Sequence, residues 1–186
     1  MIAPQGADFV SEKVLYEALE LAHEHNTLMY LHLSQGSRET KQMMMRYGSR
    51  TIPWMIERGL IDDHVVGIHL TDALPEEVQQ MVSHGGRMVL CSTAIGIIDG
   101  IQPPAKIFQD AGGAVGLGTD QANGNNEHSI FNEMRMTALF NKLKYEDPEV
   151  MPCWKVLRMA TIEGARAVGI DDVVGSLEVG KDADLI

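Results

Sequence analysis

The chain contains 186 residues, of which 45% are hydrophobic and 22% are charged, and its formal net charge is −11 at pH 7. This length suffices for one sizeable core or one large piece of a bigger domain, and the composition is that of a globular protein. The acidic charge argues against binding to nucleic acid or to an anionic membrane surface. Two cysteines, Cys91 and Cys153, are too few for a disulfide framework. Without an 18-residue apolar run or a signal-peptide pattern, the sequence predicts a cytoplasmic protein.

The first half of the chain alternates helical patterns with continuous apolar runs of strand length. Ser11 is a favourable helix cap, and the run that ends at His32 and Leu33 is apolar on both faces, as a buried parallel strand requires. The expected segments are the end of a strand at 1–4, a helix at 11–25, a strand at 28–33, a helix in two pieces at 38–58 that is interrupted near Gly48 and by Pro53, and a strand at 65–70.

The second half continues the same alternation. Pro75 followed by Glu76 and Glu77 is a strong helix start, because proline fits the first turn and carboxylates complement the helix dipole. The expected segments are a helix at 75–84, a strand at 87–91, a glycine-containing loop at 92–102, a short helix from Pro103 to about Gly112, a strand at 114–118, a long helix at about 127–144, one or two helices at 152–168, and a hairpin-like passage at 174–186 that enters a strand.

Four strand–helix alternations with short connections predict an α/β fold with a parallel sheet. The sheet is either open and doubly wound or part of a (β/α)8 barrel, since four or five units are about half of the eight in such a barrel. The chain has neither a G-x-G-x-x-G sequence after its first strand nor a G-x-x-x-x-G-K-[ST] sequence. Nucleotide-phosphate binding is therefore weakly supported.

Three predicted strands end in a residue that can bind metal or move a proton: His32, His69 and Asp120. Parallel strands bring their carboxyl ends to one rim, so these side chains can meet there. Neutral imidazole and carboxylate together suit zinc or another first-row divalent ion. The structural alternatives are that each histidine is a hydrogen-bonded core residue and that Asp120 caps the following turn.

Other candidate residues have ordinary structural interpretations. His23, His25 and His84 lie late in predicted helices, where a histidine complements the dipole. Cys91 ends a strand on the same rim and is expected to be a small buried filler. No spacing supports a Ser-His-Asp or Cys-His catalytic arrangement.

Six motifs along the chain stand out together. They are His32-Leu33-Ser34-Gln35, His69 followed by Pro75-Glu76-Glu77-Val78, Gly118-Thr119-Asp120 followed by Asn123-Gly124-Asn125-Asn126, Phe131-Asn132-Glu133-Met134-Arg135, Met159-Ala160-Thr161-Ile162-Glu163-Gly164-Ala165, and the stretch from Gly175 to Leu185. These motifs resemble the amidohydrolase superfamily, and within it the chlorohydrolase, cytosine deaminase and methylthioadenosine/S-adenosylhomocysteine deaminase group. The resemblance covers nearly the whole chain, and its last two motifs are the most specific in combination.

The resemblance implies a distorted (β/α)8 barrel with a small β-sandwich, and it implies roles for three residues. His32 corresponds to the metal-binding histidine of the fifth strand, and His69 to the sixth-strand histidine that polarises the attacking water or the substrate. Asp120 corresponds to the eighth-strand aspartate, which binds the metal and shuttles a proton. The implied cofactor is a divalent metal, zinc before iron, which activates water for attack on a carbon that bears an amino or halogen leaving group.

The chain departs from this pattern at two positions. Gln35 stands where the family usually has the glutamate that protonates a ring nitrogen, and an amide can donate a hydrogen bond but cannot pass a proton. Gln5 stands where a histidine is expected in this group. The first-strand His-x-His pair has no counterpart, because the only such spacing is His23-Glu24-His25 inside a predicted helix.

These departures predict a C-terminal portion of a hydrolase of C–N or C–Cl bonds in small heterocyclic substrates. Residues 1–170 would form a partial barrel, approximately strands 4 or 5 to 8, and residues 171–186 the start of the β-sandwich. Two ligands, His32 and Asp120, would bind metal weakly, so the isolated chain would be incomplete, inactive or without metal. A half barrel exposes strand edges, so we expect a homo-oligomer or association with a separate N-terminal half. The alternative is a non-catalytic half-barrel that self-associates or complements such a half.

Overall fold

The computed structural model describes residues 1–185 and has an α/β fold with four parallel strands. The strands are β1 (Met29–Leu33), β2 (Val65–His69), β3 (Arg87–Leu90) and β4 (Val115–Leu117), and their order in the sheet, β1-β2-β3-β4, is their order in the chain. The alternation of strands and helices that the sequence predicts is confirmed. Its closure into part of a barrel stays a prediction.

The start of the chain runs alongside β1. Ile2 and Gly6 form isolated parallel bridges with Met29 and His32, so residues near the start supply strand-like pairing, as predicted. In the ladder between β1 and β2, Leu33 lies opposite His69. The two histidines that the sequence singles out therefore lie at the carboxyl ends of neighbouring parallel strands.

The chain divides into two compact units. Unit 1 contains Met1–Met88 and Pro103–Gly113, and unit 2 contains Val89–Gln102 and the chain from Ala114 onward. The division falls within β3, so each unit is described by itself.

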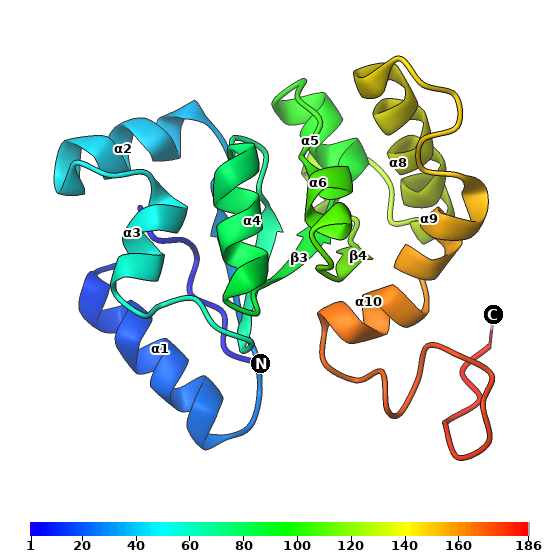
Figure 1. Ribbon diagram of the computed structural model, residues 1–186, viewed down its shortest axis with the longest axis horizontal. Coiled ribbons are helices and arrows are strands. Elements are labelled where there is room, and N and C mark those ends of the chain that lie inside the picture. Colours follow the sequence, from blue (N-terminus) through cyan, green and yellow to red (C-terminus); the bar gives the residue numbers. More distant parts are fainter. Residues whose placement is uncertain (186) are drawn as a thin grey trace. The chain divides into compact units, whose positions relative to one another are not determined.

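Five helices belong to unit 1 (Figure 1): α1 (Glu12–Glu24), α2 (Ser37–Tyr47), α3 (Thr51–Glu57), α4 (Pro75–Ser83) and α6 (Ala105–Asp110). The Ser11 side chain caps α1 by accepting a hydrogen bond from the Val14 amide, and Gly48 ends α2 in the left-handed conformation with φ 68°. Pro53 does not interrupt a helix as predicted. It lies in the first turn of α3, where the missing N–H would have no intrahelical partner.

The core of unit 1 fills the space between the strands and these helices. Helix α1 packs on β1, α2 on α3, α3 on α4, and α4 on α6. Burial of these apolar side chains is the main force that holds the strands in place. Fully buried side chains include Leu15, Leu31, Met43, Met55, Val78 and Met81.

Unit 2 contains α5 (Ser92–Ile98), α7 (Ala122–Asn125), α8 (Ile130–Tyr145), α9 (Cys153–Met159) and α10 (Ile162–Ala167). The loop predicted at 92–102 is wrong over its first seven residues, because these form α5. Gly96 in α5 allows close packing against α8. A Cβ at Gly96 would lie 2.7 Å from a ring carbon of Phe140 in α8. The hydroxyls of Ser92 and Thr137 share a buried hydrogen bond of 2.7 Å between the same two helices.

The C-terminal segment of the described chain contains turns and bends. Between residues 171 and 185 no helix or strand is assigned, and residue 186, the last of the predicted β-sandwich segment, lies outside the described residues. The sandwich therefore stays a prediction. No helix within residues 1–185 has the length and apolar content that crossing a membrane would require.

Candidate metal and proton-handling site

His32 is held in one orientation and one tautomer by the start of the chain. Its Nδ1 lies 2.7 Å from the backbone carbonyl oxygen of Gln5, and a carbonyl can only accept, so Nδ1 carries the hydrogen. The other ring nitrogen, Nε2, then keeps its lone pair. Metal-binding histidines are commonly oriented by such a bond to a backbone carbonyl. The backbone at Gln5, where the sequence lacks an expected histidine, thus fixes the orientation of the His32 ring.

His69 stacks on His32 at the end of the neighbouring strand. The ring centroids are 5.3 Å apart and the ring planes differ by 17°. His69 is completely buried, and its φ of 80° is in the left-handed region, as is the φ of 53° at Leu70. Such conformations in residues other than glycine are uncommon, and they cluster at functional sites. The rings of these two residues therefore lie side by side, and their roles in a site stay predictions.

The loop that carries Gln35 is fixed by a buried carboxylate. Glu39 in α2 accepts hydrogen bonds from the backbone amides of Ser34 and Gln35, each at 2.8 Å, and from the Thr51 hydroxyl at 2.6 Å. Burial raises the pKa of Glu39, and these hydrogen bonds partly oppose the rise. Gln35 therefore follows β1 on a loop with a defined backbone.

The loop after His69 is anchored by Arg50. The Arg50 guanidinium contacts the buried carboxylate of Glu77 through two nitrogens, at 2.6 and 3.2 Å, and donates to the backbone carbonyl of Asp72. The Asp72 side chain accepts from the Thr40 hydroxyl at 2.6 Å. This network ties the connection between β2 and α4 to α2 and α3, so the backbone around His69 is rigidly supported.

Asp120 belongs to unit 2 and follows β4. It has a φ of 61°, and its Oδ1 accepts a hydrogen bond of 2.7 Å from the Gln121 amide. This local bond is the turn-capping contact that the structural alternative predicted.

The backbone beside Asp120 is held by a buried network around Glu133 of α8. Glu133 accepts from the Thr93 amide at 3.1 Å and from the Asn125 side-chain amide at 2.7 Å. The same Asn125 nitrogen donates to the Thr119 carbonyl oxygen. Glu133 is completely buried, and its network holds the loop that follows β4 in place.

Cys91 lies close to Asp120 within unit 2. Burial raises the pKa of the Cys91 thiol strongly, and the negative charges of Asp120 and Glu133 raise it further. The thiol is therefore neutral and unreactive, which agrees with its predicted role as a small buried filler.

Sequence patterns predicted some of this site and missed other parts. His32 and His69 lie together at the ends of β1 and β2, and Gln35 follows β1 on the adjoining loop, whereas the position of Asp120 relative to them stays a prediction. The supporting carboxylates Glu39 and Glu133 were not predicted as functional. Each is a glutamate within a predicted helix, and the sequence alone does not show that the fold buries it.

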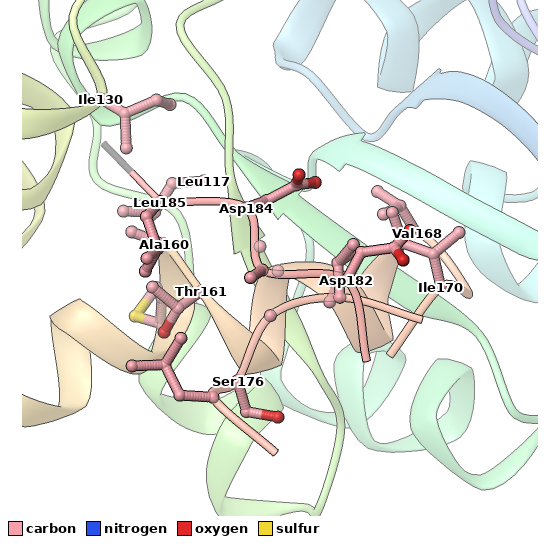
Figure 2. A pocket seen from close by; sticks show the side chains of 18 of the residues that line it. Leu117, Ile130, Ala160, Thr161, Val168, Ile170, Ser176, Asp182, Asp184 and Leu185 are labelled. Carbon is pink, nitrogen blue, oxygen red and sulfur yellow. The ribbon is translucent and has the colours of Figure 1, made fainter. Parts of the chain in front are cut away.

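Unit 2 also contains a cavity of about 920 Å³ beside β4. Figure 2 shows side chains from the end of β4, from α9 and α10, and from the C-terminal segment around it. Its lining is mainly apolar and includes none of the predicted site residues. The motif that ends at Leu185 thus helps to enclose an apolar space along β4, the last strand in the sheet order. The labelled lining residues are Leu117, Ile130, Ala160, Thr161, Val168, Ile170, Ser176, Asp182, Asp184 and Leu185.

A parallel α/β sheet with imidazole and carboxylate groups after its strands is an architecture that metal-dependent hydrolases use. The sequence model described as "Amidohydrolase family" matches residues 1–186. The chain therefore belongs to the amidohydrolase family.

Curated relatives agree with this assignment over part of their length. The chain is 32% identical over 186 residues to a 5-methylthioadenosine/S-adenosylhomocysteine deaminase of Syntrophus aciditrophicus, covering 100% of this chain and 42% of that protein. It is 31% identical over 192 residues to a 5'-deoxyadenosine deaminase of Methanothermobacter thermautotrophicus, covering 100% of this chain and 43% of that protein. The chain thus spans less than half the length of these relatives.

Solved structures show the same fold. An adenosine deaminase from Xanthomonas campestris with bound zinc superimposes with a TM-score of 0.94 and 29% identity, over 98% of this chain and 42% of that chain. An atrazine chlorohydrolase from Arthrobacter aurescens in complex with zinc has a TM-score of 0.91 and 21% identity, over 98% and 40%. At 21% identity the second similarity shows the fold alone.

Proposed function

We propose that this chain is the C-terminal portion of a metal-dependent hydrolase that cleaves C–N or C–Cl bonds in small heterocyclic substrates. The observation that carries the proposal is the orientation of His32, whose Nδ1 bond to the Gln5 carbonyl leaves Nε2 available beside the buried His69. The names of the relatives support amino-substituted purine nucleosides as the first substrate class to test.

The residues present fit a divalent metal by their chemistry. His32 offers a neutral imidazole nitrogen and Asp120 a carboxylate oxygen, which are the donors that zinc prefers, with iron as a second choice. When bound, the metal would lower the pKa of a water molecule so that it attacks at neutral pH. Catalytic zinc usually has three protein ligands, so two ligands from this chain form an incomplete site.

The remaining site residues act on protons and on orientation. His69 would polarise the water or the substrate, and Asp120 would accept a proton from the water and deliver it to the leaving group. Gln35 can orient a ring nitrogen by a hydrogen bond. It cannot protonate that nitrogen, so a proton that the ring nitrogen gains when water attacks must come from another residue.

Association with a further polypeptide would complete both the fold and the ligand set. The apolar cavity beside β4 supports this part of the proposal, because a strand at the end of a sheet is normally covered or paired. The partner is either a second copy of the chain or a separate N-terminal half, and the substrate is a small molecule.

The test is complementation. The chain is mixed with the N-terminal portion of the Syntrophus aciditrophicus relative and zinc, and ammonia release from 5'-methylthioadenosine is measured alongside chloride release from a chlorotriazine. We expect one of the two activities in the mixed sample only, and its loss in His69→Ala. Formation of a stable complex without either activity, at saturating zinc, would contradict the enzymatic proposal.

A non-catalytic half-barrel is the second candidate, and Gln35 is the observation that favours it. The family position that usually carries a proton-donating glutamate is an amide in this chain. A Gln35→Glu variant of the complemented sample separates the two. The catalytic proposal predicts that activity changes with this residue, whereas a scaffold remains inactive with either residue.

A further inference from the structure

Three potential metal ligands lie together in unit 1, away from the site described above. They are His23 in the last turn of α1, and Asp62 and His64 in the connection that leads into β2. One ligand atom from each side chain lies within 4.8 Å of the other two. The Nε2 atom of His23 is 2.7 Å from Oδ2 of Asp62, and the rings of His23 and His64 meet edge to face with centroids 4.5 Å apart.

The cluster is built on a supported backbone. Oδ1 of Asp62 accepts a hydrogen bond of 2.8 Å from the His64 amide, which turns Oδ2 toward His23. The carbonyl oxygen of His64 accepts from the Met29 amide at 2.8 Å, so its main chain is tied to β1. Nδ1 of His64 lies 3.0 Å from Oδ1 of Asp63, a carboxylate that can orient the ring as carboxylates orient metal-binding histidines.

The spacing of the ligand atoms suits a tetrahedral ion. Ligands at about 2.0–2.2 Å from zinc lie roughly 3.3–3.6 Å from one another, and the present separations, 2.7 Å between His23 and Asp62 and at most 4.8 Å within the cluster, lie on either side of that range, so side-chain rotation would accompany binding. The side chains are 47%, 33% and 25% exposed for His23, Asp62 and His64, so an ion can enter and water can complete its coordination. Two imidazoles and one carboxylate are the donors that zinc uses in proteins with an open fourth position.

This cluster is independent of the proposed catalytic ligands. His64 directly precedes the first residue of β2, and His69 is its last residue. Five residues of extended chain span about 16 Å, which places the two histidines at opposite ends of the strand. A metal at one end therefore cannot share ligands with a metal at the other.

We propose that His23, Asp62 and His64 bind one divalent transition metal, zinc by their donor chemistry. The bound ion would join the end of α1 to the start of β2. In the chain without metal, the bond between His23 and Asp62 holds the side chains near these positions. The site differs from the ordinary helix-end role of a histidine because it needs all three side chains.

The experiment is equilibrium dialysis of the full chain against zinc chloride, followed by metal analysis of the protein. We expect His23→Ala and His64→Ala each to lose one equivalent of zinc relative to the unmodified chain. His25→Ala is the matched control, because His25 ends the same helix and is exposed but lies outside the cluster. Asp63→Asn, which alters only the support of His64, should weaken zinc binding about tenfold.

Folding is checked by circular dichroism in chelator, since His23 lies on an exposed helix surface and its replacement should leave the metal-free fold unchanged. Zinc should also raise the melting temperature of the His25→Ala chain more than that of the His23→Ala chain. The proposal is overturned if His23→Ala, folded by this criterion, binds as many equivalents of zinc as His25→Ala with the same affinity.

Discussion

Two buried carboxylates hold the loops that carry the candidate site residues. Glu39 binds the Ser34 and Gln35 amides, and Glu133 binds the Thr93 amide and Asn125. A buried carboxylate is costly unless several donors surround it, and in both places backbone amides supply them. The two carboxylates thus convert flexible loops after β1 and β4 into defined ones.

Replacing Glu39 should destabilise the chain markedly. Glu39→Ala leaves two backbone amides and the Thr51 hydroxyl without their partner, so we expect a loss of about 2–4 kcal/mol in the free energy of unfolding. Urea denaturation measures it. Glu20→Ala is the control, because Glu20 is an exposed helical glutamate and should cost less than about 0.5 kcal/mol. Equal losses in the two variants would contradict the role assigned to Glu39.

The two cysteines should differ in reactivity. The Cys91 thiol is buried and its pKa is raised by burial and by the charges of Asp120 and Glu133, so between pH 7 and 9 it stays protonated. Cys153 is exposed. We expect iodoacetamide to label Cys153 alone in the folded chain and both cysteines in urea, as mass spectrometry of peptides would show. Labelling of Cys91 in the folded chain at the rate of Cys153 would contradict the described packing.

The residue types predicted the candidate site residues better than they predicted the buried carboxylates that hold the neighbouring loops. His32 and His69 stand out because histidines are unusual within apolar strands, and the structure brings them together. Glu39 lies in a helix with polar neighbours, and its sequence context resembles that of an exposed glutamate. Its burial depends on how α2 packs against α3, and no local sequence pattern predicts that packing.

At the scale of elements, strand positions were predicted well, and the two short helices α5 and α7 were missed. Buried parallel strands are marked by continuous apolar runs, and each of the four lies where such a run occurs. Helix α5 was taken for a loop because glycine lowers helix propensity. Contact with Phe140 outweighs that propensity, since only glycine allows the two helices to approach so closely.

Filling the space at Gly96 should therefore destabilise unit 2. Gly96→Val places side-chain atoms against the Phe140 ring, and overpacking of this kind costs about 1–3 kcal/mol in the free energy of unfolding. Ile97→Ala in the same helix is the control, because Ile97 is 56% exposed and should cost much less. Chemical denaturation of the two variants compares them. A Gly96→Val chain as stable as the control would show that α5 does not pack on α8 as described.

At the scale of the whole molecule, the chain spans 42% of the Syntrophus aciditrophicus relative and ends its sheet at β4 beside an apolar cavity. We expect self-association, because an edge strand and an apolar space are rarely left uncovered. Light scattering during size-exclusion chromatography should then give at least twice the chain mass of 20.5 kDa. A monomer at every concentration would contradict self-association and would leave a separate N-terminal half as the proposed partner.

We propose that His32 and Asp120 together bind a divalent metal. The most direct measurement is the zinc content of a His23→Ala chain, which lacks the second proposed site, after dialysis at saturating zinc. We expect this chain to bind one equivalent with the weak affinity of a two-ligand site, and adding His32→Ala or Asp120→Asn to remove it, with the fold checked by circular dichroism. Zinc binding that is unchanged by both additional substitutions would contradict the claim.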